Sequence, residues 1–285
     1  MIYRLTDNDL NNASAALRVR GPDANSFLQG QFTQDLKLAE KGPAYGLWLD
    51  QKGKVLADSY IIRSGPNDYL LVSFGSPAAV IQTRLESYLI ADEVELSDET
   101  GKWATALVWG ESAAPIALPD EAITWPSRRA SPGGREILLP LAQMSKLRLV
   151  AEPATRAAAE LSRLRAGIPS IPADIGPRDL PAEGALDDAA ISFTKGCYLG
   201  QEVVARLKNL GQVRRALHLI GGAGAPPANG TMLHQGDRKV GEVRSAAADG
   251  GNFLAMAMLS LVNLEASAPL GLAPGGRETR ILRRV

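Results

Sequence analysis

The amino-acid sequence predicts an α+β fold, and three observations support this class. Two apolar runs at 45–49 and 55–62 flank the polar turn 50–53, a pattern typical of a β-hairpin. The order strand, strand, helix, strand continues from there, which favours an α+β unit over a doubly wound parallel sheet. After Gly211 the pattern is β again, with glycine-rich turns between short strands. We therefore expect an α+β region followed by a small β domain.

Length and composition indicate an ordinary soluble protein of two compact units. The chain has 285 residues, which exceeds the usual size of one domain. Its 31 Lys and Arg balance 31 Asp and Glu, which argues against a nucleic-acid partner held by a global basic field. The N-terminal residues lack the pattern of a signal peptide, and the apolar runs are too short to span a bilayer. We expect a cytoplasmic protein with no membrane partner, and one cysteine is compatible with that reducing compartment.

The first region is expected to alternate strands with two helices. Its strands are predicted at 15–19, 45–49, 55–62, 69–72, 94–96 and 103–109, and its helices at 24–29 and from Ser76. Pro77 is expected at the first helical position, where its missing N–H is not needed. The apolar face of this second helix is predicted to carry Val80, Ile81, Leu85, Tyr88 and Leu89.

The rest of the chain is expected to hold one helix, a long connector and the β domain. Residues 115–140 form loops between short strands, and a helix runs from about Pro153 to Ala166 before Gly167 ends it. The proline-rich stretch 168–186 is an irregular connector, and connectors of that length are usually functional or disordered. Strands of a small barrel or sandwich are predicted at 213–220, 231–233, 239–245, 252–261 and 279–285.

The single cysteine, Cys197, is the first candidate for chemistry. It lies in the segment Lys-Gly-Cys-Tyr-Leu-Gly-Gln-Glu at 195–202, just ahead of a predicted helix. Lys195 and a helix N-terminus would favour a thiolate, whereas Glu202 would oppose it. The other interpretation is a buried, inert cysteine. One cysteine excludes an internal disulfide, and one cysteine with two separated histidines offers no zinc or iron–sulfur ligand set, so no metal site is expected.

Asp58 is the second candidate. It interrupts a strand of apolar and small residues, so its carboxylate either faces solvent or is held by partners. Phosphate-binding loops, dinucleotide fingerprints and the serine-hydrolase elbow are all absent from the sequence.

The segment around Cys197 resembles the signature of the YgfZ-type folate-binding proteins, which are relatives of the glycine-cleavage T-protein, an aminomethyltransferase. The likeness continues in Arg165-Ala166-Gly167-Ile168-Pro169, in Pro181-Ala182-Glu183 and in Leu186-Asp187. At the N-terminus it includes residues 19–23, 27–31, 33–35 and 52–58. The resemblance spans most of the chain, and the segment 195–202 is its most specific part.

The resemblance implies a ring-like T-protein fold with a ferredoxin-like part at about 45–150, within a folate-binding region 1–210, and a C-terminal β-barrel at 211–285. It implies tetrahydrofolate or a derivative as the cofactor. Glu183 would read the pterin, and the glutamyl tail would contact Arg165, Arg206 or Lys208. Residues of the signature itself would complete this site, namely Tyr198, Gly200, Gln201 and Glu202.

Three functional hypotheses follow from the resemblance. The first is support of iron–sulfur cluster assembly or repair, with a link to tRNA modification, in which Cys197 is the working thiol, Lys195 favours the thiolate, and assembly or client proteins are transient partners. The second is a folate-dependent aminomethyltransferase or demethylase that uses Asp58. T-proteins carry paired aspartates at this position, whereas this chain has Ala57-Asp58, and Ser73-Phe74 replaces their Asn-Ala. The third is a scaffold with a vestigial pocket.

Overall fold

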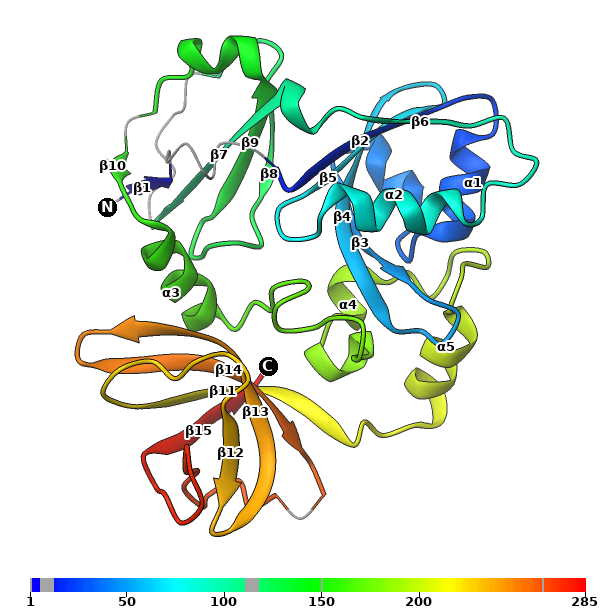
Figure 1. Cartoon of the computed structure of the whole chain (residues 1–285). Helices are drawn as coiled ribbons and strands as arrows, with labels where there is room; N and C mark the ends of the chain where they lie inside the picture. Colours follow the sequence, from blue (N-terminus) through cyan, green and yellow to red (C-terminus); the bar gives the residue numbers. More distant parts are fainter. Residues whose placement is uncertain (1, 6–12, 111–117, 150, 263) are drawn as a thin grey trace.

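The computed structural model describes residues 2–5, 13–110, 118–149, 151–262 and 264–285. Its strands form three sheets of five strands each. Figure 1 shows these sheets as three lobes, with helix α4 (Asp187–Ala190) and irregular chain between them. The α+β class predicted from the sequence is confirmed. No helix among the described residues is long and apolar enough to cross a bilayer.

The first lobe is a sheet in the order β3-β4-β5-β2-β6 with two helices on one face. Its elements are β2 (Ala15–Arg20), α1 (Ala24–Gln31), a 3-10 helix (Leu36–Glu40), β3 (Ala44–Leu49), β4 (Val55–Gly65), β5 (Asp68–Ser73), α2 (Ala78–Glu86) and β6 (Glu95–Asp98). The predicted hairpin is present, with Leu47 of β3 opposite Asp58 of β4. Leu28 of α1 and Ile81 of α2 pack into one buried core with the sheet residue Trp48.

Helix α2 differs from its prediction in three respects. It begins at Ala78, and Pro77 lies before it with extended backbone at φ −64° and ψ 144°, so Pro77 is the cap residue. Val80 is 41% exposed, whereas Ile81 and Leu85 are buried. Successive helical residues point about 100° apart, so Val80 and Ile81 cannot both face the sheet. The predicted apolar face was therefore too wide by Val80, and it was too long by Tyr88 and Leu89, which follow the end of the helix at Glu86.

The second lobe is a sheet in the order β10-β1-β7-β9-β8. Its strands are β1 (Ile2–Leu5), β7 (Trp103–Gly110), β8 (Ile123–Pro126), β9 (Arg135–Pro140) and β10 (Glu152–Pro153), with 3-10 helices at Thr100–Lys102 and Leu141–Lys146. The sequence did not predict β1 or β10, which pair in parallel. Strands between residues 45 and 150 therefore belong to two sheets, because β7 leaves the first lobe for the second.

Helix α3 (Arg156–Ala166) begins later than predicted, since Pro153 belongs to β10. Thr155 caps the helix by accepting a hydrogen bond from the Ala158 amide. Gly167 ends it with φ 74°, as predicted.

The C-terminal lobe is a sheet in the order β12-β13-β14-β11-β15. Its strands are β11 (Arg215–Ala223), β12 (Met232–Gln235), β13 (Arg238–Asp249), β14 (Asn252–Ser260) and β15 (Thr279–Arg284). Bridges from His234 to Gly271 and from Leu270 to Thr279 link the two edge strands, β12 and β15. These bridges close the sheet on itself, which explains the barrel-like spacing of the sequence.

The lobes meet through residues 168–200, which extend the predicted connector 168–186 and are called the connector from here on. This segment includes a 3-10 helix (Pro181–Gly184) and leads to α5 (Gln201–Leu210). The guanidinium of Arg163, on α3, lies 2.7 Å from the Asp174 carboxylate of the connector and 2.9 Å from the Ser245 hydroxyl of β13. These contacts are buried. They fix the connector, and with it the candidate site, against the C-terminal lobe.

Candidate functional site

Cys197 lies on an exposed loop whose two ends are buried. Gly196 and Cys197 are exposed, and the Cys197 thiol is free. Lys195 before them and Tyr198 after them are buried. The interpretation of Cys197 as a buried residue is therefore wrong, because the loop exposes this residue at the surface.

Lys195 anchors the first end of this loop to helix α1. Its ammonium group donates to the carbonyl oxygens of Gln29 at 2.7 Å, Phe32 at 2.7 Å and Gln34 at 3.1 Å. An ammonium group has three donors, so all are engaged at the C-terminal end of α1. Burial lowers the pKa of Lys195 to about 8. The geometry gives Lys195 an anchoring role, and no contact among the described residues connects its ammonium group to the Cys197 sulfur.

The second end of the loop rests on the β3–β4 turn. Gly200 has φ 84°, and a β-carbon there would lie 2.7 Å from the Asp50 carbonyl oxygen. A glycine is therefore required for both backbone conformation and space. The Leu199 amide donates to the Gly30 carbonyl oxygen at 3.1 Å, which adds a second contact with α1. The loop is thus held between α1 and the hairpin turn, and α5 starts directly after it.

The remaining signature residues lie at the end of this loop and in the first turn of α5. The Gln201 side chain accepts a hydrogen bond from the Tyr198 amide at 3.3 Å. Burial raises the pKa of Tyr198 to about 12, and its hydroxyl has no hydrogen-bond partner among the described residues. Glu202 is exposed in the first turn of α5, where a carboxylate complements the helix dipole.

Asp58 is half-buried and held by partners, which decides between its two interpretations. Its carboxylate accepts hydrogen bonds from Tyr45 at 3.0 Å, Ser73 at 3.0 Å and Ser76 at 2.8 Å. Burial raises the pKa of Asp58, and the hydroxyl donors oppose that rise. Ser73, which stands at the position of Asn in the T-protein pattern, is thus one of the hydrogen-bond donors to Asp58.

An aromatic cluster next to Asp58 was not predicted from the sequence. The Tyr60 ring lies 5.0 Å from Tyr45 and 5.2 Å from Trp125, while the Arg128 guanidinium lies 4.6 Å from the Tyr45 ring centre. These residues come from the first and second lobes, so no sequence pattern joins them. Asp58 is thus enclosed by aromatic rings and hydroxyl groups.

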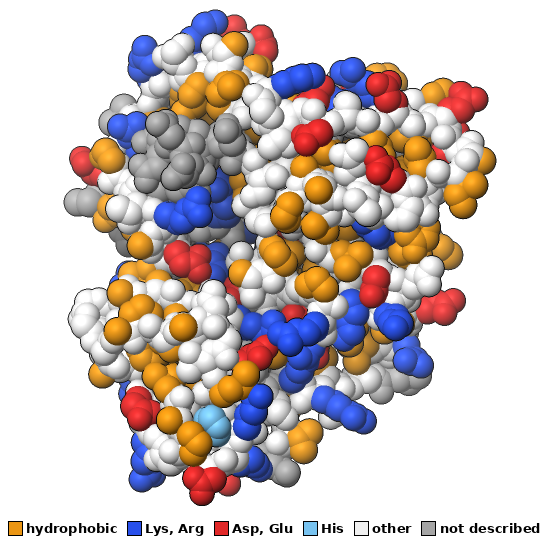
Figure 2. Space-filling view, viewed as in Figure 1, with side chains coloured by type: hydrophobic (Ala, Val, Ile, Leu, Met, Phe, Trp, Pro, Cys, Tyr) orange, Lys and Arg blue, Asp and Glu red, His pale blue; other side chains and the backbone are white. Residues whose placement is uncertain are grey.

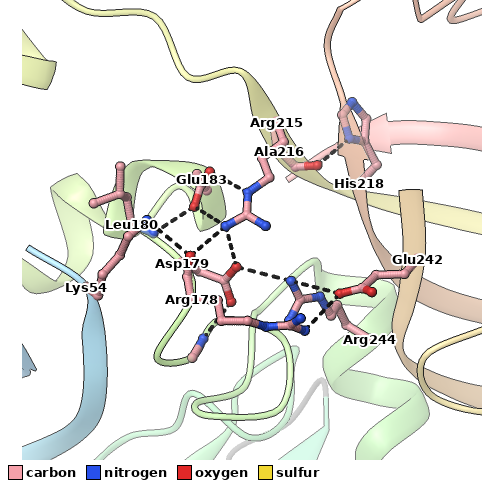
Figure 3. Close-up of polar contacts among 11 residues, drawn as sticks. Lys54, Arg178, Asp179, Leu180, Glu183, Arg215, Ala216, His218, Glu242 and Arg244 are labelled. Carbon is pink, nitrogen blue, oxygen red and sulfur yellow. Dashed lines mark hydrogen bonds and ion pairs between the residues drawn. The ribbon is translucent and has the colours of Figure 1, made fainter. Parts of the chain in front are cut away.

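Glu183 is buried in a network of charges where the connector meets the C-terminal lobe (Figure 3). Its carboxylate lies 2.7 Å from the Arg215 guanidinium and accepts the Leu180 amide, also at 2.7 Å. Arg215 also pairs with the fully buried Asp179 at 2.9 Å, and Arg244 reaches Asp179 at 3.1 Å. Arg244 is 9% exposed, and its Nε has no partner among the described residues.

The sequence did not predict Asp179, Arg215 and Arg244 as parts of this network. Figure 2 shows Lys and Arg side chains gathered where the C-terminal lobe faces the first lobe. Arg215 and Arg244 lie 36 and 65 positions from Asp179 in the chain, so no contiguous motif joins these cations to their carboxylate.

The three predicted contacts for a glutamyl tail lie apart. Arg165 pairs with Asp249 at 2.6 Å and lines a cavity of 630 Å³ beside Tyr3 and Trp109. Lys208 lines a separate cavity of 550 Å³ that shares no residue with the first. Arg206 is exposed on α5. Of the three residues, only Lys208 lines a cavity that Ala182, the neighbour of Glu183, also lines.

The described residues contain no group of three or more His, Cys, Asp or Glu side chains arranged to hold a metal ion.

Comparisons with known proteins agree with this architecture. The family model of the GCVT N-terminal domain matches residues 9–118. The crystal structure of glycine cleavage system aminomethyltransferase T from Bartonella henselae superposes with a TM-score of 0.75 at 18% identity, covering 94% of this chain and 81% of that chain. At that identity the likeness shows a shared fold.

The curated relatives carry two kinds of name. The iron-sulfur cluster assembly factor IBA57 homolog, mitochondrial, of Cryptococcus neoformans is 26% identical over 71% of this chain, which spans 63% of that relative's length. The mouse iron-sulfur cluster assembly factor IBA57, mitochondrial, is 31% identical over 76% of this chain and 66% of its own length.

The second kind of name belongs to bacterial relatives. The tRNA-modifying protein YgfZ of Edwardsiella ictaluri is 30% identical, and the alignment covers 84% of this chain and 80% of that relative. Together with the GCVT domain and the T-protein-like fold, this likeness identifies the chain as a member of the YgfZ family of GCVT-like proteins.

Proposed function

We propose that this chain supports the assembly or repair of iron–sulfur clusters, with Cys197 as its working thiol and tetrahydrofolate or a derivative as its cofactor. The observation that carries the proposal is the exposure of Cys197 between the buried residues Lys195 and Tyr198. A thiol on a fixed loop is open to a partner protein at a low ordering cost. Two relatives named as iron–sulfur cluster assembly factors support this chemistry.

Cys197 has two routes open to it. Its thiolate can attack a disulfide or persulfide of a partner, forming one sulfur–sulfur bond while the other sulfur leaves as a thiolate or sulfide, so no oxidant is required. Alternatively, it can ligate one iron of a cluster that the partner holds, since one thiol cannot hold a cluster alone. In the second route the cluster is cargo, and in both routes the assembly or client proteins are transient partners.

The charge network of Glu183 fits a folate head group. A carboxylate has about four lone-pair sites, and Arg215 and the Leu180 amide occupy three at Glu183. One acceptor therefore remains there, while the Arg244 Nε supplies a buried donor without a partner among the described residues. A free acceptor and a buried donor in one charge network would suit the amino and carbonyl edge of a pterin. When bound, tetrahydrofolate would supply nitrogen atoms that carry one-carbon units.

The thiol is tested by complementation of a strain that lacks this gene. Cys197→Ala removes only an exposed sulfur, so the protein should fold normally and fail to restore the activity of an iron–sulfur enzyme. Thr194→Ala, on the same loop and also exposed, is the matched control and should restore it. Full rescue by Cys197→Ala would remove the thiol from the function.

The cofactor is tested by calorimetric titration with tetrahydrofolate. Arg244→Gln should weaken binding, because it removes the buried donor, while Arg178→Gln removes a side chain that is 74% exposed and should leave binding unchanged. Absence of heat from the wild-type protein would instead favour a scaffold with a vestigial pocket.

A second candidate function is transfer or removal of a one-carbon group by Asp58. The raised pKa of this carboxyl group brings it closer to neutral pH, which suits a general base. Tetrahydrofolate and a methylated or aminomethylated amine should then give turnover that Asp58→Asn abolishes. Turnover that survives this substitution would exclude the role of Asp58.

A further inference from the structure

The cavity of 630 Å³ lies between the second lobe and helix α3. Its walls are strands β1 and β7, the loop at 131–132 and one face of α3. None of the described residues that line it belongs to the connector, to the Cys197 loop or to the charge network of Glu183. The cavity is therefore separate from the site proposed for folate, and its volume suits a small organic ligand.

Two aromatic rings form one wall of this cavity. Tyr3 of β1 is directly opposite Trp109 of β7, and their ring centres lie 5.6 Å apart with 32° between the ring planes. Trp109 is 5% exposed and Tyr3 is 36% exposed, so the inner ring is fixed and the outer ring is open to a ligand. On the side of α3 the lining includes the small residues Ala158 and Ser162, about one helical turn apart. A flat aromatic ring therefore has both space and a stacking partner here.

Arg165 supplies the only charge in the described lining. Among the described residues its guanidinium donates only to Asp249, through Nη2 at 2.6 Å, which leaves other N–H donors for a ligand. The Arg283 guanidinium donates to the Arg165 carbonyl oxygen at 2.7 Å and adds a second positive charge at this end of α3. Two cations beside one carboxylate favour an anionic group, and a guanidinium matches the geometry of a phosphate.

The aromatic wall and the cation lie toward opposite ends of α3. Trp109 shares a buried cluster with Ala159, which precedes Arg165 by six residues, or about 9 Å along the helix. Helical side chains lean toward the start of their helix, which shortens this span. A ligand that uses both features must carry its anionic group a few bonds away from its ring. A nucleoside monophosphate has this arrangement, with a sugar between the base and the phosphate.

Hydrogen bonds hold the walls of the cavity in place. The Ser162 hydroxyl accepts the Ser131 amide at 3.0 Å and donates to the Ser131 carbonyl oxygen at 2.5 Å. The Gly110 amide donates to the Pro132 carbonyl oxygen at 2.9 Å. The loop at 131–132 is thus tied to both α3 and β7, so a ligand meets a formed cavity and binds at a low ordering cost.

We propose that this cavity binds a 5′-nucleoside monophosphate, whose base stacks on Tyr3 and Trp109 and whose phosphate contacts Arg165. Stacking tolerates every base, so the cavity selects a ring with an anionic group and not one particular base. Such a site needs no phosphate-binding loop or dinucleotide fingerprint, neither of which the sequence contains. The inference does not rest on the proposed function, which places the folate head group at Glu183 and Arg244.

The test is a calorimetric titration of the whole chain with 5′-AMP, 5′-GMP, 5′-CMP and 5′-UMP. Adenosine, which lacks the phosphate, and ribose 5-phosphate, which lacks the base, are titrated beside them. Ala158→Phe places a ring in the cavity from an exposed position of α3. Its matched control is Ala157→Phe, at the neighbouring exposed position that does not line the cavity.

Arg165→Gln removes the cation of the lining. Its matched control is Arg20→Gln, because both arginines form surface ion pairs and are similarly exposed, at 59% for Arg165 and 54% for Arg20. The control lies in the first lobe and accounts for the loss of one positive charge.

Nucleotide should bind wild type more tightly than adenosine or ribose 5-phosphate does, and saturating tetrahydrofolate should not displace it. Ala158→Phe should weaken binding about tenfold or more, because the new ring takes the space of the base, and Ala157→Phe should not weaken it. Arg165→Gln should weaken binding about two- to fivefold, as one partly exposed charge contact would give, and Arg20→Gln should not.

Tryptophan fluorescence locates the bound base independently. The chain has four tryptophans, and a base stacked beside Trp109 should change the emission of that residue. Trp109→Phe keeps an aromatic wall, so this variant should still bind nucleotide and should lose the change in emission. A change of the same size in Trp109→Phe would place the nucleotide elsewhere and overturn the proposal.

The remaining outcomes also overturn it. Absence of binding by all four nucleotides, or equal affinities of Ala158→Phe and Ala157→Phe, would remove the ligand from the cavity. Equal affinities of Arg165→Gln and Arg20→Gln, or of adenosine and 5′-AMP, would remove the phosphate contact. These results would leave the proposals for Cys197 and for folate unchanged, whereas displacement of the nucleotide by tetrahydrofolate would show that the two ligands share one site.

Discussion

The ammonium group of Lys195 lies 2.7 Å from the carbonyl oxygen of Phe32, so the loop that exposes Cys197 is bound to the end of helix α1. This contact joins residues 163 positions apart in the chain. It explains why a lysine stands two positions before the cysteine. The lysine holds the loop in place, and the fixed loop exposes the Cys197 thiol at the surface.

Lys195→Met should therefore destabilise the protein. The substitution leaves three carbonyl oxygens without their donor, at a cost of about 2 kcal/mol or more. Urea unfolding of wild type and variant measures the difference. A variant as stable as wild type would show that these carbonyl groups find other donors and that the anchor is dispensable.

Gly200→Ala should destabilise the start of α5. The residue has φ 84°, and its new β-carbon would meet the Asp50 carbonyl oxygen at 2.7 Å. We expect a loss of about 2 kcal/mol in the free energy of unfolding. Gly196→Ala is the matched control, because no atom lies within 4 Å of a β-carbon there, and it should change stability by less than about 0.5 kcal/mol. Similar effects of both changes in thermal unfolding would contradict the packing described at Gly200.

Arg215→Met should be among the most damaging changes at the charge network. It removes the cation that pairs with both Asp179 and Glu183, of which Asp179 is fully buried. Removing one partner of a buried ion pair costs about 3 kcal/mol. Arg178→Gln, in the same network but 74% exposed, should cost less than about 1 kcal/mol. Denaturant unfolding measures the free energy of unfolding of both variants. Equal losses would mean that burial does not determine how much these ion pairs contribute to stability.

Asp58→Asn should stabilise the protein at neutral pH. The folded-state pKa of Asp58 is raised by burial, so the folded chain binds more protons than the unfolded chain in the acid range. Stability therefore falls as the pH rises through that range, and the penalty is fully present at pH 7. We expect a gain on the order of 1 kcal/mol at pH 7 that shrinks at pH 4. A loss of stability at pH 7 would show that the hydroxyl donors outweigh burial.

Much of the local structure could be predicted from the sequence, because its signals are local. The turn 50–53 and the glycine that ends α3 specify their conformations within a few residues. Pro77 was predicted one position inside the helix that it caps, since proline suits both a cap and a first turn. Val80 was predicted on the buried face of this helix and is exposed. Strands β1 and β10 escaped prediction because they are short and gain their pairing from a distant part of the chain.

The site was harder to predict than the fold for the same reason. Cys197 and Glu183 were found through motifs that are contiguous in sequence. The partners that define their environments, Phe32 for Lys195 and Arg215 for Glu183, are brought together only by the packing of the lobes. A lysine beside a cysteine suggested activation of the thiol, whereas the fold turns that lysine inward.

We propose above all that Cys197 is the working thiol of a protein that maintains the clusters of iron–sulfur enzymes. The most direct test measures iron and acid-labile sulfide per polypeptide in an iron–sulfur enzyme purified from a strain lacking this gene and complemented with wild type or Cys197→Ser. We expect full occupancy with wild type and, with Cys197→Ser, the low occupancy of the uncomplemented strain. Equal occupancy with wild type and Cys197→Ser would contradict it.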